Sequence, residues 1–209
     1  MTRSMLALFF CSLLVFTLSA QDIIPPTFED VYSLQVKELE GGNTNIDYRA
    51  FRESFLESQQ FRVANERASE LRELTQNLYE HIDKRKHEDV ISTAKKMLCI
   101  DYTSMRAHKA LQQAYKIAGD SLNHKKYHDI EFGLLRSIVQ NGDGSSCETG
   151  WPVIQIEEEY FILDMKGAEL EKQQIEGVCD KMTVRIDGKK KVYYFDAYKI
   201  FESYQILKQ

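Results

Sequence analysis

The sequence predicts an α+β protein, with stacked helical hairpins in its first part and a small C-terminal α/β unit closed by an antiparallel hairpin. Two observations support this prediction. From about residue 27 to residue 140, apolar residues recur at helical spacing. Beyond Trp151 the apolar residues alternate in short runs, and Asp187-Gly188 is a strong hairpin turn signal. We therefore divide the chain into a signal peptide (1–20), a helical region (21–140), an ordered junction loop (141–152) and a small α+β region (153–209).

Length and charge limit the classes of function. The 209 residues are 43% hydrophobic, which is enough to bury an ordinary core in one or two small domains. There are 27 Lys and Arg residues against 32 Asp and Glu residues, a formal net charge of -5. A mildly acidic surface is poorly suited to a phosphate backbone, so we expect no nucleic-acid partner.

The N-terminus has the pattern of a secretory signal. Arg3 supplies the positive charge, residues 6–18 are almost entirely apolar, and Ser19-Ala20 offers small residues for cleavage. We predict cleavage after Ala20, with cleavage after Ser19 as the alternative. About 13 apolar residues are too few to cross a hydrocarbon core, so we expect no membrane span after cleavage. The prediction is a periplasmic or secreted protein.

Cysteine parity follows from this prediction. Loss of Cys11 with the signal leaves Cys99, Cys147 and Cys179, of which at most two can pair. Cys147 and Cys179 lie in the same half of the chain and are the preferred pair, with Cys99 buried as a small hydrophobic residue. Three unpaired thiols are the alternative, because pairing cannot be read from a sequence.

The helical region begins with two capped segments. Thr27 is the predicted N-cap of the first helix, Gly41-Gly42-Asn43 ends it, and Asp47 opens the second helix. The predicted inward face of the first helix consists of Val31, Leu34, Val36 and Leu39. Four further apolar stripes lie between residues 66 and 140, and the short links between them predict antiparallel neighbours.

The third of these stripes, at residues 107–118, resembles part of a tetratricopeptide repeat. Leu111, Tyr115 and Gly119 fit one unit, and Ile100-Asp101-Tyr102 stands where the preceding unit has Leu-Asp-Pro. The resemblance covers about one and a half units, with Arg85 in place of the expected Gly, so the region is tetratricopeptide-like. Stacked helix pairs of this kind serve either partner binding or scaffolding.

One helical segment has the spacing of a metal site. His124 and His128 are four residues apart, and Glu131 follows on the next turn, so three ligands could share one face. The segment lacks the Glu beside the first His that a zinc-protease helix carries. We therefore favour a solvated helix face, and we expect no metal and no cofactor.

The C-terminal part alternates strands and helices. Residues 152–156 read as a strand, 157–163 as a short helix ended by Gly167, and 182–186 and 192–195 as two strands joined by Asp187-Gly188. Asp196 is placed to cap a last helix. Residues 189–191, three lysines, are interpreted as a solvated turn that protects a sheet edge.

Several runs resemble an uncharacterised bacterial family, domain of unknown function 4919. The most specific is Gly142-Asp143-Gly144-Ser145-Ser146-Cys147-Glu148-Thr149, followed here by Gly150-Trp151. The other runs are Ile46-Asp47-Tyr48, Phe55-Leu56-Glu57-Ser58, Val153-Ile154, Glu158-Glu159-Tyr160-Phe161-Ile162-Leu163 and Tyr194-Phe195-Asp196. The resemblance implies an exported protein with a helical first part and a small mixed second part. It implies no activity.

The Gly142 to Thr149 run also contains the candidate catalytic residues Asp143, Cys147 and Glu148. A cysteine nucleophile needs a positioned base, and no His lies in this run or in the α+β region that follows it. Local turn chemistry explains the same residues: Gly142 would end a helix, Asp143-Gly144 would turn, and Trp151 would pack where the two parts meet.

Two functions of different classes remain. We prefer a non-enzymatic periplasmic partner-binding or scaffold protein, with another envelope protein as candidate partner. The alternative is a hydrolase-like or metal-assisted enzyme with a site at the junction. An exposed apolar strip on the helical layer would favour partner binding.

Overall fold

The computed structural model describes residues 27–206, and for residues 204–206 it describes the backbone alone. The signal peptide predicted at residues 1–20, including Cys11, lies outside the described residues. Within the described range, no helix has both the length and the apolar character needed to cross a membrane. The chain forms an α+β fold, as predicted from the sequence.

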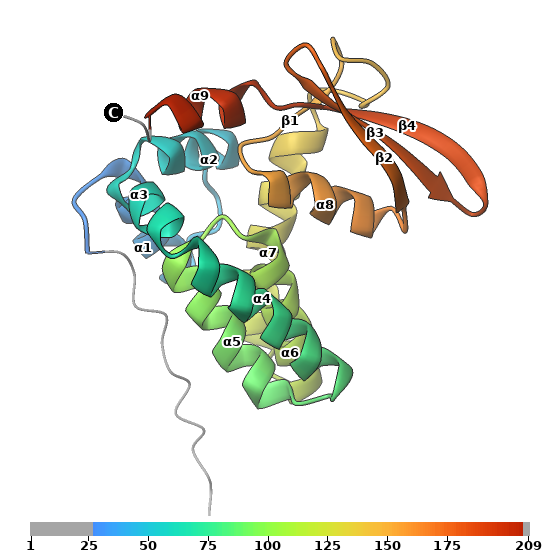
Figure 1. Ribbon diagram of the computed structural model, residues 1–209. Coiled ribbons are helices and arrows are strands. Elements are labelled where there is room, and N and C mark those ends of the chain that lie inside the picture. Colours follow the sequence, from blue (N-terminus) through green and yellow to red (C-terminus); the bar gives the residue numbers. More distant parts are fainter. Residues whose placement is uncertain (1–26, 207–209) are drawn as a thin grey trace, which may run out of the picture.

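Between residues 27 and 140, seven helices build the first part (Figure 1). They are α1 (Val31–Glu40), α2 (Tyr48–Glu57), α3 (Gln59–Glu66), α4 (Ala68–Asp83), α5 (His87–Ile100), α6 (Met105–Ala118) and α7 (Ser121–Val139). Helices α4 to α7 pack side by side in chain order, which gives the predicted helical hairpins. Local interactions set the ends of the helices. The Asp47 carboxylate accepts the Ala50 N–H at 3.1 Å at the start of α2, and Gly119, with φ of 75°, ends α6.

The first helix differs from its prediction. Its N-cap is Asp30 and not Thr27, because the Asp30 carboxylate accepts the Ser33 N–H at 2.8 Å. Val31 and Leu34, expected to face inward, are 64% and 56% exposed. The buried face is instead formed by Tyr32, Val36 and Leu39, which follow the i, i+4, i+7 spacing of a single helical stripe. Tyr32 fixes this choice, since its hydroxyl accepts the Tyr102 N–H at 3.0 Å.

The second part is a mixed four-stranded sheet with one helix after its first strand and one after its last strand. Its elements are β1 (Trp151–Pro152), α8 (Ile156–Met165), β2 (Glu169–Glu176), β3 (Cys179–Ile186), β4 (Lys189–Asp196) and α9 (Tyr198–Ile206). The strand order is β1-β4-β3-β2, with β1 parallel to β4 and the other pairs antiparallel. The sheet and α8 lie at one end of the helical layer (Figure 1).

The predicted hairpin is confirmed, and two other strand predictions are wrong. Asp187 and Gly188 both have positive φ, 48° and 74°, which is the conformation of a two-residue type I′ turn. The strand expected at residues 152–156 is instead Trp151–Pro152, so only Pro152 is common to the two. The lysines at 189–191, expected in a turn, are exposed residues of β4 itself. Strand β2 had no prediction, because all eight of its residues are exposed and no apolar alternation marks it.

A buried ion pair joins the two parts. Arg52 of α2 donates from Nε and Nη2 to the two carboxylate oxygens of Glu158 in α8, at 2.8 and 2.6 Å. Their side chains are 3% and 5% exposed. Arg52 also donates to the Pro152 carbonyl at 3.1 Å, and Glu158 accepts the Ile154 N–H at 2.8 Å. One pair therefore fixes α2, β1 and the start of α8 together.

Replacing Arg52 with Ala should cost about 3 to 5 kcal/mol of unfolding free energy, because the Glu158 charge would remain buried without a partner. Urea denaturation followed by circular dichroism measures this. The matched control is Arg49→Ala on the same helix: Arg49 forms an exposed pair with Glu53 at 3.2 Å, and its loss should cost less than about 0.5 kcal/mol. Equal losses in the two variants would contradict this role for Arg52.

A disulfide joins the junction loop to the sheet. Cys147 pairs with Cys179 of β3, which is the preferred pairing, with the two Cα atoms 5.8 Å apart. Cys99 is free, as expected, but it is half-buried instead of fully buried. The bridge closes a loop with a sequence separation of 32 residues.

Reduction of this bridge should lower the unfolding free energy by about 3 to 4 kcal/mol, because a closed loop of this length restricts the unfolded chain. Urea denaturation with and without dithiothreitol tests this. The variant Cys99→Ala should keep the full sensitivity to reductant, whereas the double variant Cys147→Ser/Cys179→Ser should lose it. Reductant sensitivity that persists in the double variant would overturn the assignment.

Candidate functional site

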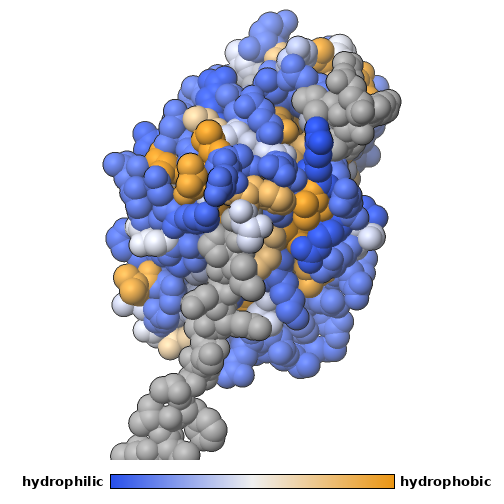
Figure 2. Space-filling view, turned by 90° about the vertical axis from the view of Figure 1, so that its left-hand side faces the viewer, coloured by the Kyte–Doolittle hydropathy of each residue, from blue (hydrophilic) through white to orange (hydrophobic). Residues whose placement is uncertain are grey.

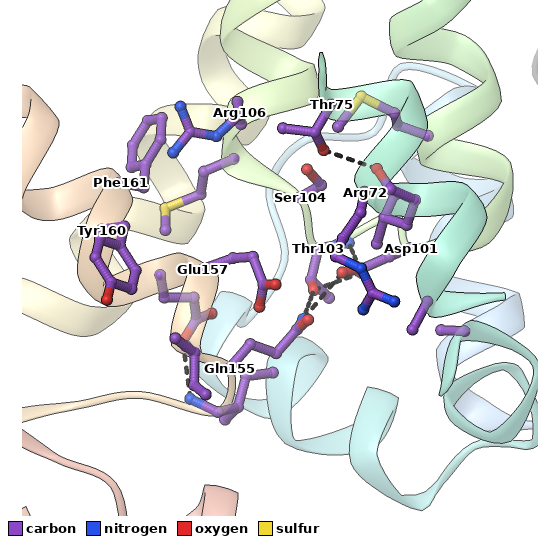
Figure 3. Close-up of a pocket in the computed structure, with 18 of the residues that line it drawn as sticks. Arg72, Thr75, Asp101, Thr103, Ser104, Arg106, Gln155, Glu157, Tyr160 and Phe161 are labelled. Atoms are coloured by element: carbon purple, nitrogen blue, oxygen red, sulfur yellow. Dashed lines mark hydrogen bonds between the residues drawn. The ribbon is translucent and has the colours of Figure 1, made fainter. Parts of the chain in front are cut away.

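A groove of about 720 Å³ lies between α4, the α5–α6 link and α8 (Figure 3). The α4 wall contributes Arg72, Thr75 and Tyr79, among others, and the α8 wall contributes Glu157, Tyr160 and Phe161. Three stretches far apart in the sequence thus meet around one space. Its volume falls in the range of about 300 to 1,000 Å³ that is usual for ligand sites.

The floor of the groove carries a hydrogen-bonded acid. Asp101 follows α5 directly and is 3% exposed. Its Oδ1 accepts the Thr103 N–H at 2.8 Å and the Thr103 hydroxyl at 2.6 Å, and its Oδ2 accepts the Gln155 amide at 3.0 Å. Burial raises the pKa of Asp101 to about 6, although these hydrogen bonds favour the ionised form. In Figure 3, Asp101, Thr103 and Gln155 meet at one end of the groove.

Charged residues of both signs stand on the walls. Arg106 donates to Asp164 at 3.1 Å and its guanidinium lies 5.2 Å from the Tyr79 ring centre, so its position is fixed from both sides of the groove. Arg72 of α4 and Glu157 of α8 also line the groove, and neither forms an ion pair with another described residue. These two charges are therefore available to a bound molecule.

Exposed apolar side chains stand on both walls of the groove, and we call them the apolar strip. Tyr79 of α4 is 44% exposed, and Ile156 and Tyr160 of α8 are 39% and 36% exposed. On α4 only Leu78 is fully buried, although the helix has 16 residues. The face of α4 that looks toward α8 therefore lacks a covering element among the described residues. On the side of the molecule shown in Figure 2, hydrophobic residues form patches within a mostly hydrophilic surface.

The junction run forms a turn closed by its own side chains. Asp143 accepts the Ser145 N–H at 2.9 Å and the Thr149 hydroxyl at 2.7 Å. These hydrogen bonds lower the pKa of Asp143 to about 2, so the carboxyl is ionised and already occupied by local donors. Trp151, which is buried, donates its indole N–H to the Gly142 carbonyl at 3.0 Å. The expected local turn chemistry is present.

Gly142 has a different role from the predicted one. Helix α7 already ends at Val139, with Gln140 as its cap residue, so Gly142 does not end it. A Cβ at Gly142 would lie 2.3 Å from the Thr149 carbonyl oxygen, which leaves room only for glycine. The close approach of two backbone segments, and not a helix terminus, requires this residue.

The candidate catalytic residues do not meet at a cavity. Cys147 is in the disulfide and so has no thiol to act as a nucleophile. Asp143 and Glu148 are exposed, and hydrogen bonding from Ser146 lowers the pKa of Glu148. Neither of them, nor Cys147, lines either of the two cavities described for this structure.

The candidate metal ligands also contact different partners. His124 donates from Nδ1 to the Gln112 carbonyl at 3.0 Å. In contrast, His128 is exposed, and its Nδ1 lies 3.3 Å from Oδ1 of Asp129. Glu131 is 7% exposed, and burial raises its pKa. Among residues 27–206, no group of three or more potential ligands is placed to hold a metal ion.

The groove residues were missed by sequence reasoning. Asp101 was noted only as a repeat position, and Gln155 only as part of a strand. The available signal was local: Asp101 two residues before Thr103 is the spacing at which an Asp side chain bonds the following backbone. Nothing in the sequence shows that Gln155, 54 residues later, completes the arrangement.

Comparison with known proteins gives the family but no function. No curated protein and no solved structure matches the chain. The model of one family, described as a domain of unknown function (DUF4919), matches residues 44–206. This range contains α2 to α9, the groove walls and the Gly142 to Thr149 run on which the predicted resemblance rested. The chain belongs to the DUF4919 family.

Proposed function

We propose that the protein is an exported, non-enzymatic partner-binding protein whose α4–α8 groove receives a segment of another envelope protein. The observation that carries this proposal is the exposed apolar strip formed by Tyr79, Ile156 and Tyr160. Exposed apolar side chains that line a hollow are typical of interaction sites.

The chemistry of the groove indicates the kind of segment that fits. Two helices form its walls, an arrangement suited to an amphipathic segment that lays apolar side chains between them. Arg72 on one wall and Glu157 on the other have no ion-pair partner among the described residues. A segment with an apolar centre, an acidic residue facing α4 and a basic residue facing α8 would match both the strip and the charges.

Export is supported by the sequence and by the disulfide. Residues 1–20 have the charge, apolar run and small residues of a cleavable signal. Disulfides persist in oxidising compartments such as the periplasm, and the Cys147–Cys179 bridge fits such a location.

Cell fractionation tests export. We expect the chain in the periplasmic or secreted fraction, beginning at Gln21 when its N-terminus is sequenced, and with Cys147 and Cys179 oxidised. The double variant Leu13→Arg/Val15→Arg interrupts the apolar run and should leave an uncleaved chain inside the cell with reduced cysteines. A wild-type chain that stays uncleaved in the cytoplasm would refute export.

Charged substitutions in the strip should abolish partner binding without unfolding the protein. In Tyr79→Glu/Ile156→Glu, both changes are at exposed positions, so the unfolding free energy should change by less than about 1 kcal/mol. A photo-crosslinker at Tyr160 identifies the bound segment in cells, and a synthetic peptide of that segment then gives the dissociation constant. We expect the double variant to weaken peptide binding by about tenfold or more, because each charge would be buried against apolar side chains.

The control for this experiment is Ile117→Glu/Leu122→Glu. These residues are 62% and 79% exposed but do not line the groove. The control should bind the peptide as the wild type does. Equal loss in both double variants, or a crosslinked segment without apolar residues, would count against the groove as the binding site.

A further inference from the structure

Strand β4 has an outer edge that is covered over only part of its length. At the C-terminal end of the strand, β1 pairs with the last two residues, and the Tyr194 N–H donates to the Gly144 carbonyl at 2.9 Å. From Lys189 to Tyr193, no strand among the described residues pairs with this edge. We call this stretch the free edge. In Figure 1 the hairpin of β3 and β4 extends away from the helical layer, so no helix covers its end.

The free edge presents the backbone groups of Lys190 and Val192. The Tyr194 N–H points outward, to Gly144, and the pairing of β4 with β3 continues without a register shift to the turn. Backbone groups of alternate residues in an antiparallel strand face opposite sides. The N–H and C=O groups of Val192 and Lys190 therefore also point outward. Such groups at the edge of a sheet can pair with a further strand.

Four lysines surround the free edge. Lys189, Lys190 and Lys191 are exposed residues of β4, and Lys166 at the end of α8 lies 5.0 Å from the ring centre of Tyr193. None of the four forms an ion pair with another described residue. A chain with a formal net charge of -5 thus gathers positive charge at one strand edge.

These lysines disfavour a second copy of the chain at the same edge. Two free edges placed side by side would bring lysine against lysine, and like charges on paired strands are destabilising. Lysines on an edge strand are one of the means by which proteins prevent pairing between identical edges. The same charges attract a strand of opposite charge, so the edge selects its partner by charge.

We propose that the free edge binds an extended acidic segment of another protein as an added strand. The outward backbone groups of Lys190 and Val192 would supply the hydrogen bonds, as in other complexes in which a peptide extends a sheet. Side chains alternate along a strand, so Lys189 and Lys191 lie on the same face as Tyr193, beside Lys166. Glu or Asp at every second position of the bound segment would meet these three lysines.

Titration with a short capped peptide in which Glu alternates with Thr, followed by NMR of the backbone amides, tests the proposal. We expect the amide signals of Lys190 and Val192 to shift and their hydrogen exchange to slow by about tenfold or more at saturation, because pairing would protect these N–H groups. A peptide with Lys in place of Glu should not bind. Slow exchange of the two amides before peptide is added would contradict the proposal, because the edge would then already be covered.

The contribution of the charges is measured with Lys189→Gln/Lys191→Gln. This variant should bind the acidic peptide about five- to tenfold more weakly at physiological salt. The matched control, Lys84→Gln/Lys86→Gln, removes the same number of charges from the α4–α5 link, where both lysines form exposed ion pairs. Its affinity for the peptide should stay within about twofold of the wild type. Equal losses in the two variants would count against the free edge as the binding site.

The variant Val192→Pro distinguishes strand addition from attraction by the lysines alone. Proline removes an outward N–H that has no partner among the described residues, so β4 keeps its pairing with β3. The four lysines remain, yet we expect at least about tenfold weaker peptide binding. Equal affinity in the wild type and Val192→Pro, or unchanged exchange of the Lys190 amide in the saturated wild type, would overturn the proposal. The exchange measurement decides if Val192→Pro fails to fold, and neither result depends on whether the α4–α8 groove binds a partner.

Discussion

The buried pair between Arg52 and Glu158 determines how the two parts of this protein meet. The two residues are 106 positions apart, yet they form a two-pronged contact with nearly complete burial. Burying two charges costs several kcal/mol per ion, and the interaction is favourable only when the remaining polar atoms are also satisfied. Here the Pro152 carbonyl and the Ile154 N–H complete the arrangement. The backbone between β1 and α8 is therefore held by the same charges that attach α8 to α2.

The position of α8 in turn shapes both the groove and a second cavity, of about 390 Å³, between β2, β3 and α9. The side of α8 that faces α4 forms one wall of the groove, and Glu159, the residue after Glu158, is buried beside Asp180 of the sheet. Ile156 and Ile200 line both cavities, so the two spaces adjoin each other. The Arg52–Glu158 pair holds α8 against α2, and the Arg106–Asp164 pair holds its other end against α6.

Much of the fold was predictable because it depends on local patterns. Amphipathic spacing predicted the helical hairpins, and Asp187-Gly188 predicted the β-hairpin between β3 and β4, because each signal lies within a few residues. The misses have physical reasons. Val31 and Leu34 are apolar but exposed, because Tyr32 and its contact with Tyr102 determine which face of α1 is buried. Strand β2 is stabilised by pairing with β3 and not by burial, so its sequence carries no apolar alternation.

The candidate sites were less predictable, because reactive residue types in a short run were weighed without their surroundings. The Gly142 to Thr149 run identified the family correctly, but its Cys147 belongs to a disulfide and its Asp143 to a turn. The groove could not be predicted from the sequence, because α4, Asp101 and α8 come together only in the folded chain. The burial of Arg52 could not be predicted either, because a lone charge on an amphipathic helix normally faces water.

The three consecutive glutamates at the start of α8 show how far environment outweighs residue type. All three favour the positive end of the helix dipole, and sequence alone gives them the same interpretation. Glu157 faces the groove without an ion-pair partner, Glu158 is ionised against Arg52, and Glu159 is buried and neutral. The helix turns by about 100° per residue, so consecutive side chains meet the groove, the helical layer and the sheet in succession. One turn of helix thereby supplies a surface charge, a structural ion pair and a buried neutral acid.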